Sequence, residues 1–122
     1  MAFTFVALGD DEVRINNYAD NLELVPTGQS RIRFINGVVG VEQVNFVNAA
    51  NGGTFAAGIF FGQGTDNFNV DSNTRTFNIN ETDVGTFYRI ESFVLTPGVN
   101  YTYIVVGEGT DPENVDLIVL ER

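Results

Sequence analysis

The chain has 122 residues, with 16 acidic and 6 basic side chains and a formal net charge of -10; every basic residue is arginine, because lysine and histidine are absent. Nucleic acid is not expected as a partner, because binding it requires basic groups that release counterions. Without histidine, cysteine or lysine the chain cannot build a serine triad, a thiol nucleophile, a Schiff base or a histidine-ligated metal site, so we expect no enzyme. No apolar run approaches the roughly 18 residues that a transmembrane helix needs.

The predicted secondary structure is all-β, because short runs rich in Val, Ile, Phe, Tyr and Thr alternate with Gly, Asn, Asp and Pro. In chain order, strands are expected at 2–8, 21–25, 30–36, 41–48, 54–61, 66–71, 74–80, 85–96, 100–107 and 115–121. Turns about every 8–12 residues favour an antiparallel β-sandwich of the immunoglobulin-like, Greek-key type over a barrel.

Alternation within the strands predicts which side chains are buried. Arg31 and Arg33 alternate with apolar residues, so both arginines are expected to face water. The runs YTYIVV and LIVL are apolar on both faces, and strands of this kind are expected at the centre of a sheet. The core residues predicted on these grounds are Phe77, Ile79, Ile104 and Val119.

One strand pattern occurs twice in the chain. FTFVALGD at 3–10 and YTYIVVGE at 101–108 both read aromatic, Thr, aromatic, three aliphatic residues, Gly and an acid. An acidic loop and a second apolar run follow each copy, LELV at 22–25 and LIVL at 117–120. We therefore expect residues 1–26 to form a hairpin like the last hairpin of a preceding unit.

The repeat divides the chain into an N-terminal hairpin at 1–28 and a β-sandwich domain at 29–122. An isolated hairpin is marginal in water, so this one must pair with an edge of its own domain or of a neighbouring copy. Pairing between copies that does not close on itself produces a filament.

Residues 29–122 resemble the domain of unknown function 4397 family. The resemblance rests on the segments SRIRFING, VEQVNFV, IFFGQGTDNFNVDSNTRTFNIN and FVLTPGVNYTYIVVGEGTDPENVDLIVL. Its most specific parts are residues 60–62, the strand at Asp66 and residues 97–107, whereas residues 37–40 read Gly-Val-Val-Gly where the family commonly has Ser-Pro-Asp-Ala-Pro. The resemblance implies a β-sandwich of secreted or surface proteins, often in tandem, and it supplies no catalytic residues.

The expected function is an extracellular structural module that assembles with copies of itself, by β-strand complementation, into a surface filament or appendage. Two alternatives stay open: a carbohydrate- or ligand-binding adhesion domain whose exposed Phe, Tyr and Asn line a loop end, and a non-assembling fragment of a tandem-repeat surface protein. No secretion signal follows Met1, so the sequence is expected to be a mature or excised segment, or else an intracellular protein. The residues expected to carry assembly are Phe3, Phe5, Val6 and Leu8, with Leu22 and Leu24 in the second strand of the hairpin.

No cofactor is expected, although the acidic loops offer oxygen ligands for calcium. No stretch has the spaced acidic pattern of a calcium loop, so the simpler interpretation is solvated loop acids. The calcium candidates are Asp10, Asp11, Asp111 and Asp116. Two N-glycosylation sequons begin at Asn80 and Asn100, of which Asn80 is on a predicted polar face.

Overall fold

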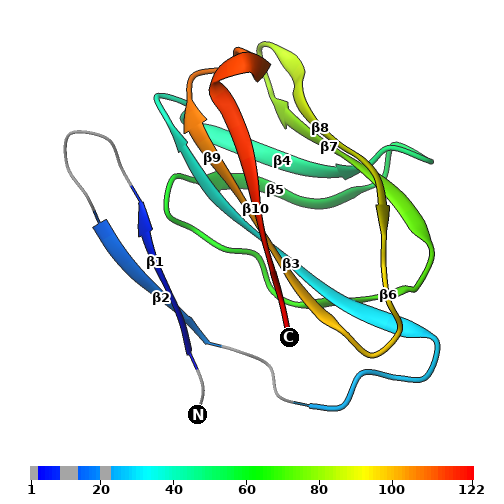
Figure 1. Cartoon of the computed structure of the whole chain (residues 1–122). Coiled ribbons are helices and arrows are strands. Elements are labelled where there is room, and N and C mark those ends of the chain that lie inside the picture. The colour runs from blue at the N-terminus through cyan, green and yellow to red at the C-terminus, as the bar shows by residue number, and fades with distance from the viewer. Residues whose placement is uncertain (1–2, 9–13, 20–22) are drawn as a thin grey trace.

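The fold is a β-sandwich with an additional hairpin on one side, as described by a computed structural model (Figure 1). The structure describes residues 3–8, 14–19 and 23–122, and Val6 is the one residue of the first two strands whose side chain is described. The strands are β1 (Phe3–Leu8), β2 (Arg14–Ala19), β3 (Gln29–Val39), β4 (Gln43–Asn48), β5 (Thr54–Phe60), β6 (Phe68–Asp71), β7 (Thr74–Glu81), β8 (Gly85–Val94), β9 (Asn100–Glu108) and β10 (Val115–Glu121), with a 3-10 turn, η1 (Pro112–Asn114).

Two four-stranded sheets form the sandwich, which confirms the predicted fold class. One has the order β10-β9-β3-β6 and is called here the β9 sheet; the other has the order β5-β4-β7-β8 and is called the β7 sheet. Within the described residues the strand pairs are antiparallel except β3 with β9, which run parallel. The chain changes sheet repeatedly, after β3, β5, β6 and β8, so each sheet contains strands from both halves of the sequence.

Aromatic side chains from both sheets meet in the core. The Phe34 ring stacks on Phe46 with centroids 4.5 Å apart, and lies 5.4 Å from Phe77 and 5.3 Å from Tyr103. The predicted burial of Phe77, Ile79 and Ile104 is confirmed. Val119 is only partly buried, because β10 is an edge strand of the β9 sheet.

The terminal hairpin of β9 and β10 explains the glycine of the repeat. Gly107 has φ +137° and pairs with Val115, and a Cβ at this position would overlap the backbone oxygen of Asn114. A side chain is therefore excluded by both conformation and space. The expectation that YTYIVV is central is confirmed, since β9 lies between β10 and β3, but the same expectation for LIVL is wrong because β10 has no outer neighbour in its sheet.

The N-terminal hairpin forms, but with a different second strand from the one predicted. β1 pairs antiparallel with β2 from Phe3 opposite Ala19 to Leu8 opposite Arg14, so residues 9–13 connect them. The predicted second strand at 21–25 is wrong, because Leu24 is outside any strand and 95% exposed. A short connection fixes the register of a hairpin more readily than the longer one that LELV would have required.

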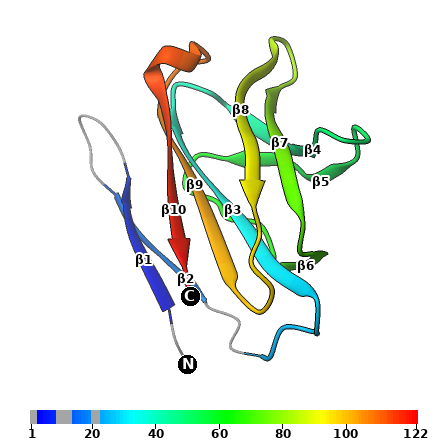
Figure 2. The same ribbon diagram turned by 45° about the vertical axis from the view of Figure 1, so that its right-hand side comes forward.

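The prediction that Arg31 and Arg33 face water is also wrong, since they are only 3% and 5% exposed. Both lie on the outer face of the β9 sheet, opposite the core, where Arg33 Nε donates to Thr102 Oγ1 at 2.9 Å. Arg31 Nη1 donates to the backbone oxygen of Glu23 at 2.7 Å, in the segment that leads from the hairpin into β3. The hairpin lies alongside this sheet, on the side away from the β7 sheet (Figure 1, Figure 2), so part of the outer face is covered.

Candidate functional site

The outer face of the β9 sheet carries an apolar patch. Ile35 of β3 and Ile104 of β9 are neighbours in the parallel register, and Ile118 of β10 is opposite Ile104 in the antiparallel register. Side chains paired in this way point to the same side of a sheet. Together with nearby apolar residues they form what we call the outer apolar face: Ile35, Phe61, Ile104, Val106, Ile118 and Leu120.

The hairpin contacts this face through Val6. Val6 is partly buried and packs with Ile35 and Ile104, in a cluster separate from the main core. Val6 occupies the same position in the first copy of the repeat as Ile104 does in the second. The two copies of the repeated strand therefore contact each other through equivalent residues. Cover is partial, because Ile118 and Leu120 on the same face remain 47% and 42% exposed.

The residues predicted to carry assembly are divided by this arrangement. Phe3, Phe5 and Leu8 are in β1 as expected, but their side chains lie outside the described part of the chain. Leu22 also lies outside the described residues, and Leu24 is not part of the hairpin. The expected contact between copies therefore involves β1, in which Val6 is the residue whose side chain is described.

Two of the calcium candidates hold their carboxylates in local hydrogen bonds. Asp111 Oδ1 accepts from the backbone N–H of Glu113 at 3.0 Å, where it caps η1, and Asp116 Oδ1 accepts from Leu117 N at 2.8 Å. Among the described residues no three acidic side chains gather as metal ligands, while Asp10 and Asp11 lie outside them.

The two glycosylation candidates are both partly buried in strands. Asn80 in β7 accepts from the Thr86 hydroxyl at 2.6 Å, and Asn100 opens β9 with its side-chain oxygen 3.4 Å from Arg31 Nη1. The polar face predicted for Asn80 is present, because its neighbour Ile79 points into the core.

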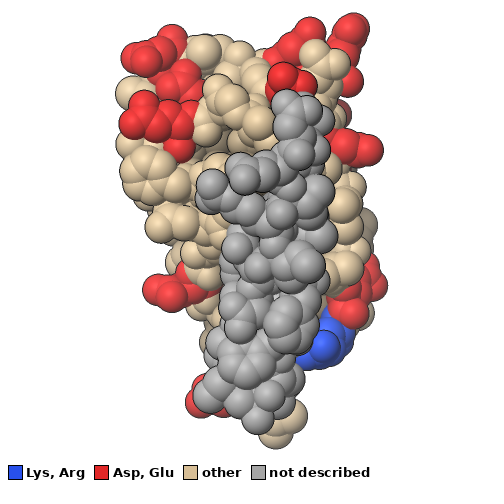
Figure 3. Space-filling model, turned by 90° about the vertical axis from the view of Figure 1, so that its left-hand side faces the viewer, with Lys and Arg blue, Asp and Glu red and all other residues tan. Residues whose placement is uncertain are grey.

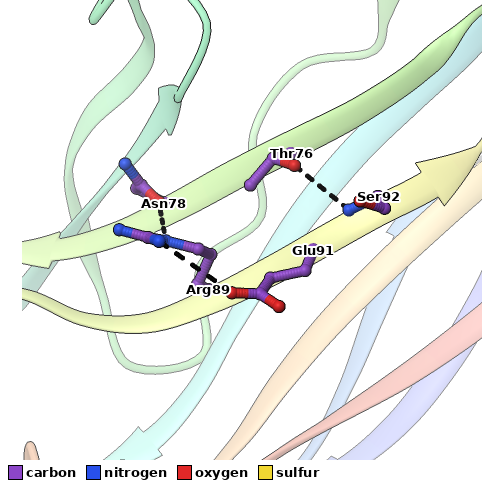
Figure 4. Close-up of polar contacts among 5 residues, drawn as sticks. All are labelled: Thr76, Asn78, Arg89, Glu91 and Ser92. Atoms are coloured by element: carbon purple, nitrogen blue, oxygen red, sulfur yellow. Dashed lines mark hydrogen bonds and ion pairs between the residues drawn. The ribbon is translucent and has the colours of Figure 1, made fainter.

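A polar concavity on the β7 sheet was not foreseen from the sequence. It has a volume of about 540 Å³ and lies where β4, β7 and β8 meet the loops that follow β4 and β6. Arg89 Nε donates to Asn78 Oδ1 at 3.0 Å across β7 and β8, and Arg89 Nη1 is 3.9 Å from Glu91 Oε1 (Figure 4). The alternation RTFNIN indicated this polar face, but the approach of Arg89 depends on a strand register that the sequence does not reveal.

Two tyrosines of β9 have different hydroxyl environments. Tyr101 Oη accepts the backbone N–H of Thr96 at 2.7 Å, as in a tyrosine corner. Tyr103 is fully buried, its hydroxyl has no hydrogen-bond partner among the described residues, and burial, with smaller contributions from Tyr101 and Glu121, raises its pKa far above the ordinary value. The pKa of Tyr88 is also raised, first by burial and then by Asp116.

Among the side chains coloured in Figure 3, acidic groups lie at the top and along both sides of the view, and a basic group is visible near its lower end. Copies of a chain with a net charge of -10 repel one another at low ionic strength. Nowhere in the described ranges is there a helix long and apolar enough to span a membrane.

Comparison with known proteins identifies a family but no function. A search of curated proteins finds no significant match. Among solved structures, the C-terminal domain of AlgF from P. aeruginosa has a TM-score of 0.51 and 9% sequence identity, over 79% of this chain and 98% of that one. Such a likeness concerns the fold alone. The family model described as "Domain of unknown function (DUF4397)" matches residues 30–122, so this chain belongs to the DUF4397 family.

Proposed function

We propose that this protein is a structural β-sandwich module that associates with copies of itself, and that the N-terminal hairpin is the element exchanged between copies. One observation carries the proposal: the hairpin is a separate two-stranded sheet, held against the outer apolar face through Val6. A partner's hairpin would meet the same face and make the same contact. Exchange of an element between identical chains is a low-cost route to association.

The outer apolar face also offers more surface than the described contact uses. Ile118 and Leu120 lie on the edge strand β10, close to half exposed. An edge strand with apolar side chains can accept a further strand or pack against another copy. A head-to-tail arrangement of this kind does not close, which is the geometry that a filament or appendage requires.

Location outside the cell belongs to the same proposal and is supported by the family resemblance. We also propose that the module is not an enzyme, which is supported by the lack of His, Cys and Lys in the sequence. A carbohydrate-binding adhesion role is the alternative function, and the polar concavity on the β7 sheet is the observation that favours it.

The proposal can be tested with a pair of charge-matched valine variants. Val6→Asp places a carboxylate against Ile35 and Ile104, whereas Val94→Asp places one on β8, where Val94 is already 66% exposed. Sedimentation velocity over a range of concentrations should show higher-mass species for the unmodified chain and for Val94→Asp, and a monomer for Val6→Asp. Equal association of both variants would contradict a role for the hairpin contact.

Salt provides an independent test of the same proposal. Added sodium chloride shortens the screening length to about 8–10 Å near physiological ionic strength, so repulsion between copies weakens and association should increase. Dissociation by salt would instead indicate that ion pairs hold the copies together.

A further inference from the structure

The polar concavity on the β7 sheet is lined by several hydrogen-bond donors. The side-chain oxygen of Asn78 is occupied by Arg89 Nε, and that of Asn48 accepts the backbone N–H of Ala50 at 3.1 Å. The Thr76 hydroxyl accepts from Ser92 N at 3.1 Å (Figure 4), which leaves its own proton to donate. The donors left at these three residues are two amide NH₂ groups and a hydroxyl proton, and Asn73 and Thr74 add a further amide and hydroxyl to the lining.

Two arginines add charge to these donors. Arg75 donates through Nε and Nη2 to the backbone oxygen of Asp71, at 3.3 Å each, so its described contacts leave its positive charge without a carboxylate partner. The side chains of Arg89 and Glu91 are 54% and 71% exposed, and an exposed pair at 3.9 Å is weak and easily displaced. The lining of the concavity contains Arg75 and Arg89 and no acidic residue, so positive charge is in excess there. The other arginines with described side chains lie elsewhere: Arg31 and Arg33 are on the opposite sheet, and Arg122 is at the chain end.

A donor-rich site selects a ligand rich in acceptors. We propose that the concavity binds the acidic sugar residue of a glycan, with its carboxylate between Arg75 and Arg89 and its ring and glycosidic oxygens facing Asn48, Thr76 and Asn78. Arginine binds carboxylates through paired N–H groups, and the neighbouring amides and hydroxyl suit the oxygens of a sugar. The volume of about 540 Å³ lies within the range of small-molecule sites, roughly 300–1,000 Å³.

The overall charge of the protein narrows the ligand further. A densely charged polyanion would be repelled by a chain of net charge -10, whereas an isolated carboxylate within an otherwise neutral saccharide would be repelled much less. The site also lies on the sheet opposite the hairpin, so ligand binding and association between copies use different surfaces.

The test is a titration of the full chain, labelled with ¹⁵N, with three small ligands. Cellobiouronic acid and cellobiose differ by one carboxylate, and glutarate carries carboxylates without sugar hydroxyls. We expect saturable shifts in β7, β8 and the loop after β4 with cellobiouronic acid, and about tenfold weaker binding of each of the other two ligands. Absence of saturable shifts, or equal binding of cellobiose or glutarate, would overturn the assignment.

Charge-matched variants then locate the site. Arg75→Gln and Arg89→Gln should each weaken binding of cellobiouronic acid about tenfold, while Arg122→Gln, which removes the same charge elsewhere, should leave it within about twofold. Glu91→Gln should tighten binding about twofold to fivefold by removing the competing carboxylate, a gain that misfolding cannot produce. Equal losses in all three arginine variants, or no gain with Glu91→Gln, would refute the site.

Discussion

Replacing Tyr103 by phenylalanine should stabilise this protein, although truncation of a core side chain normally destabilises one. The Tyr103 ring packs among Phe34, Phe77 and Phe93, with centroids 5.1–5.4 Å away, and the substitution keeps these contacts. The hydroxyl is buried and has no hydrogen-bond partner in the described part of the chain, and such a group costs about 1–3 kcal/mol. Removal should therefore raise the free energy of unfolding by ~1 kcal/mol, after allowing for the small space that the oxygen leaves.

Tyr101 is the matched control for this experiment. It is on the same strand, its ring stacks on Tyr103 with centroids 6.2 Å apart, and its hydroxyl accepts the N–H of Thr96. Tyr101→Phe leaves that N–H without its partner, so the free energy of unfolding should fall by about 1 kcal/mol or more. Urea denaturation of both variants should give shifts of opposite sign, and a loss of stability in both would refute the argument.

The pH dependence gives the same test a second measurement. Burial raises the pKa of Tyr103 in the folded state above the ordinary value of 10.0, so ionisation of this residue favours the unfolded chain. The free energy of unfolding of the unmodified chain is therefore unaffected by this titration below pH 10 and falls as the pH rises above it. At pH 10.5 the unfolded chain gains ~0.8 kcal/mol from ionising this residue. The advantage of Tyr103→Phe over the unmodified chain should therefore be larger at pH 10.5 than at pH 7. An unchanged difference would mean that the hydroxyl is not buried.

Three further predictions concern the core, a bulge and the acidic loops. Phe77→Ala should lower the free energy of unfolding by about 3–5 kcal/mol in urea, and a loss below about 1 kcal/mol would remove Phe77 from the core. Ser92 has φ +47° at a bulge in β8, so Ser92→Gly should raise stability by about 0.5–1 kcal/mol, and a loss would contradict backbone strain there. Calcium and sodium at equal ionic strength should give the same sedimentation profile, whereas an effect specific to calcium would indicate a site in the acidic loops at 10–12 and 108–116.

Strand positions were predictable because each strand carries its own signal. Alternation in β7 and the continuous apolar run of β9 are local features, and the remaining strands also occur near their expected ranges with small differences at their ends. The second strand of the N-terminal hairpin was not predictable in this way. LELV has the stronger apolar pattern, but the register of a hairpin depends on the length of its connection, which favoured Arg14–Ala19.

The burial of side chains on the outer faces of the sheets was harder to predict than the strands themselves. Alternation of polar and apolar residues distinguishes the two faces of a strand, but it does not reveal which other part of the chain covers each face. Arg31 and Arg33 alternate with buried residues as a solvent-facing pair would, yet a further layer of chain lies over their side of the sheet. The concavity on the β7 sheet depends in the same way on long-range register. Asn78 and Arg89 are 11 positions apart and meet only because β7 and β8 pair with those residues opposite each other.

The residues on the outer face of the β9 sheet determine how readily the hairpin that covers it can be replaced by the hairpin of another copy. Arg33 Nε donates to Thr102 Oγ1 within the sheet itself, so this bond does not depend on what lies above it. Removing the hairpin would expose the apolar side chains of Ile35 and Ile104 to water, which costs free energy. A hairpin from another copy that presents Val6 would repay that cost, whereas a polar surface would not. Association by exchange should therefore be selective for copies of this chain. Val6→Asp chains keep the accepting face but donate an impaired hairpin, so when mixed with the unmodified protein they should end its higher-mass species and shift them to lower mass.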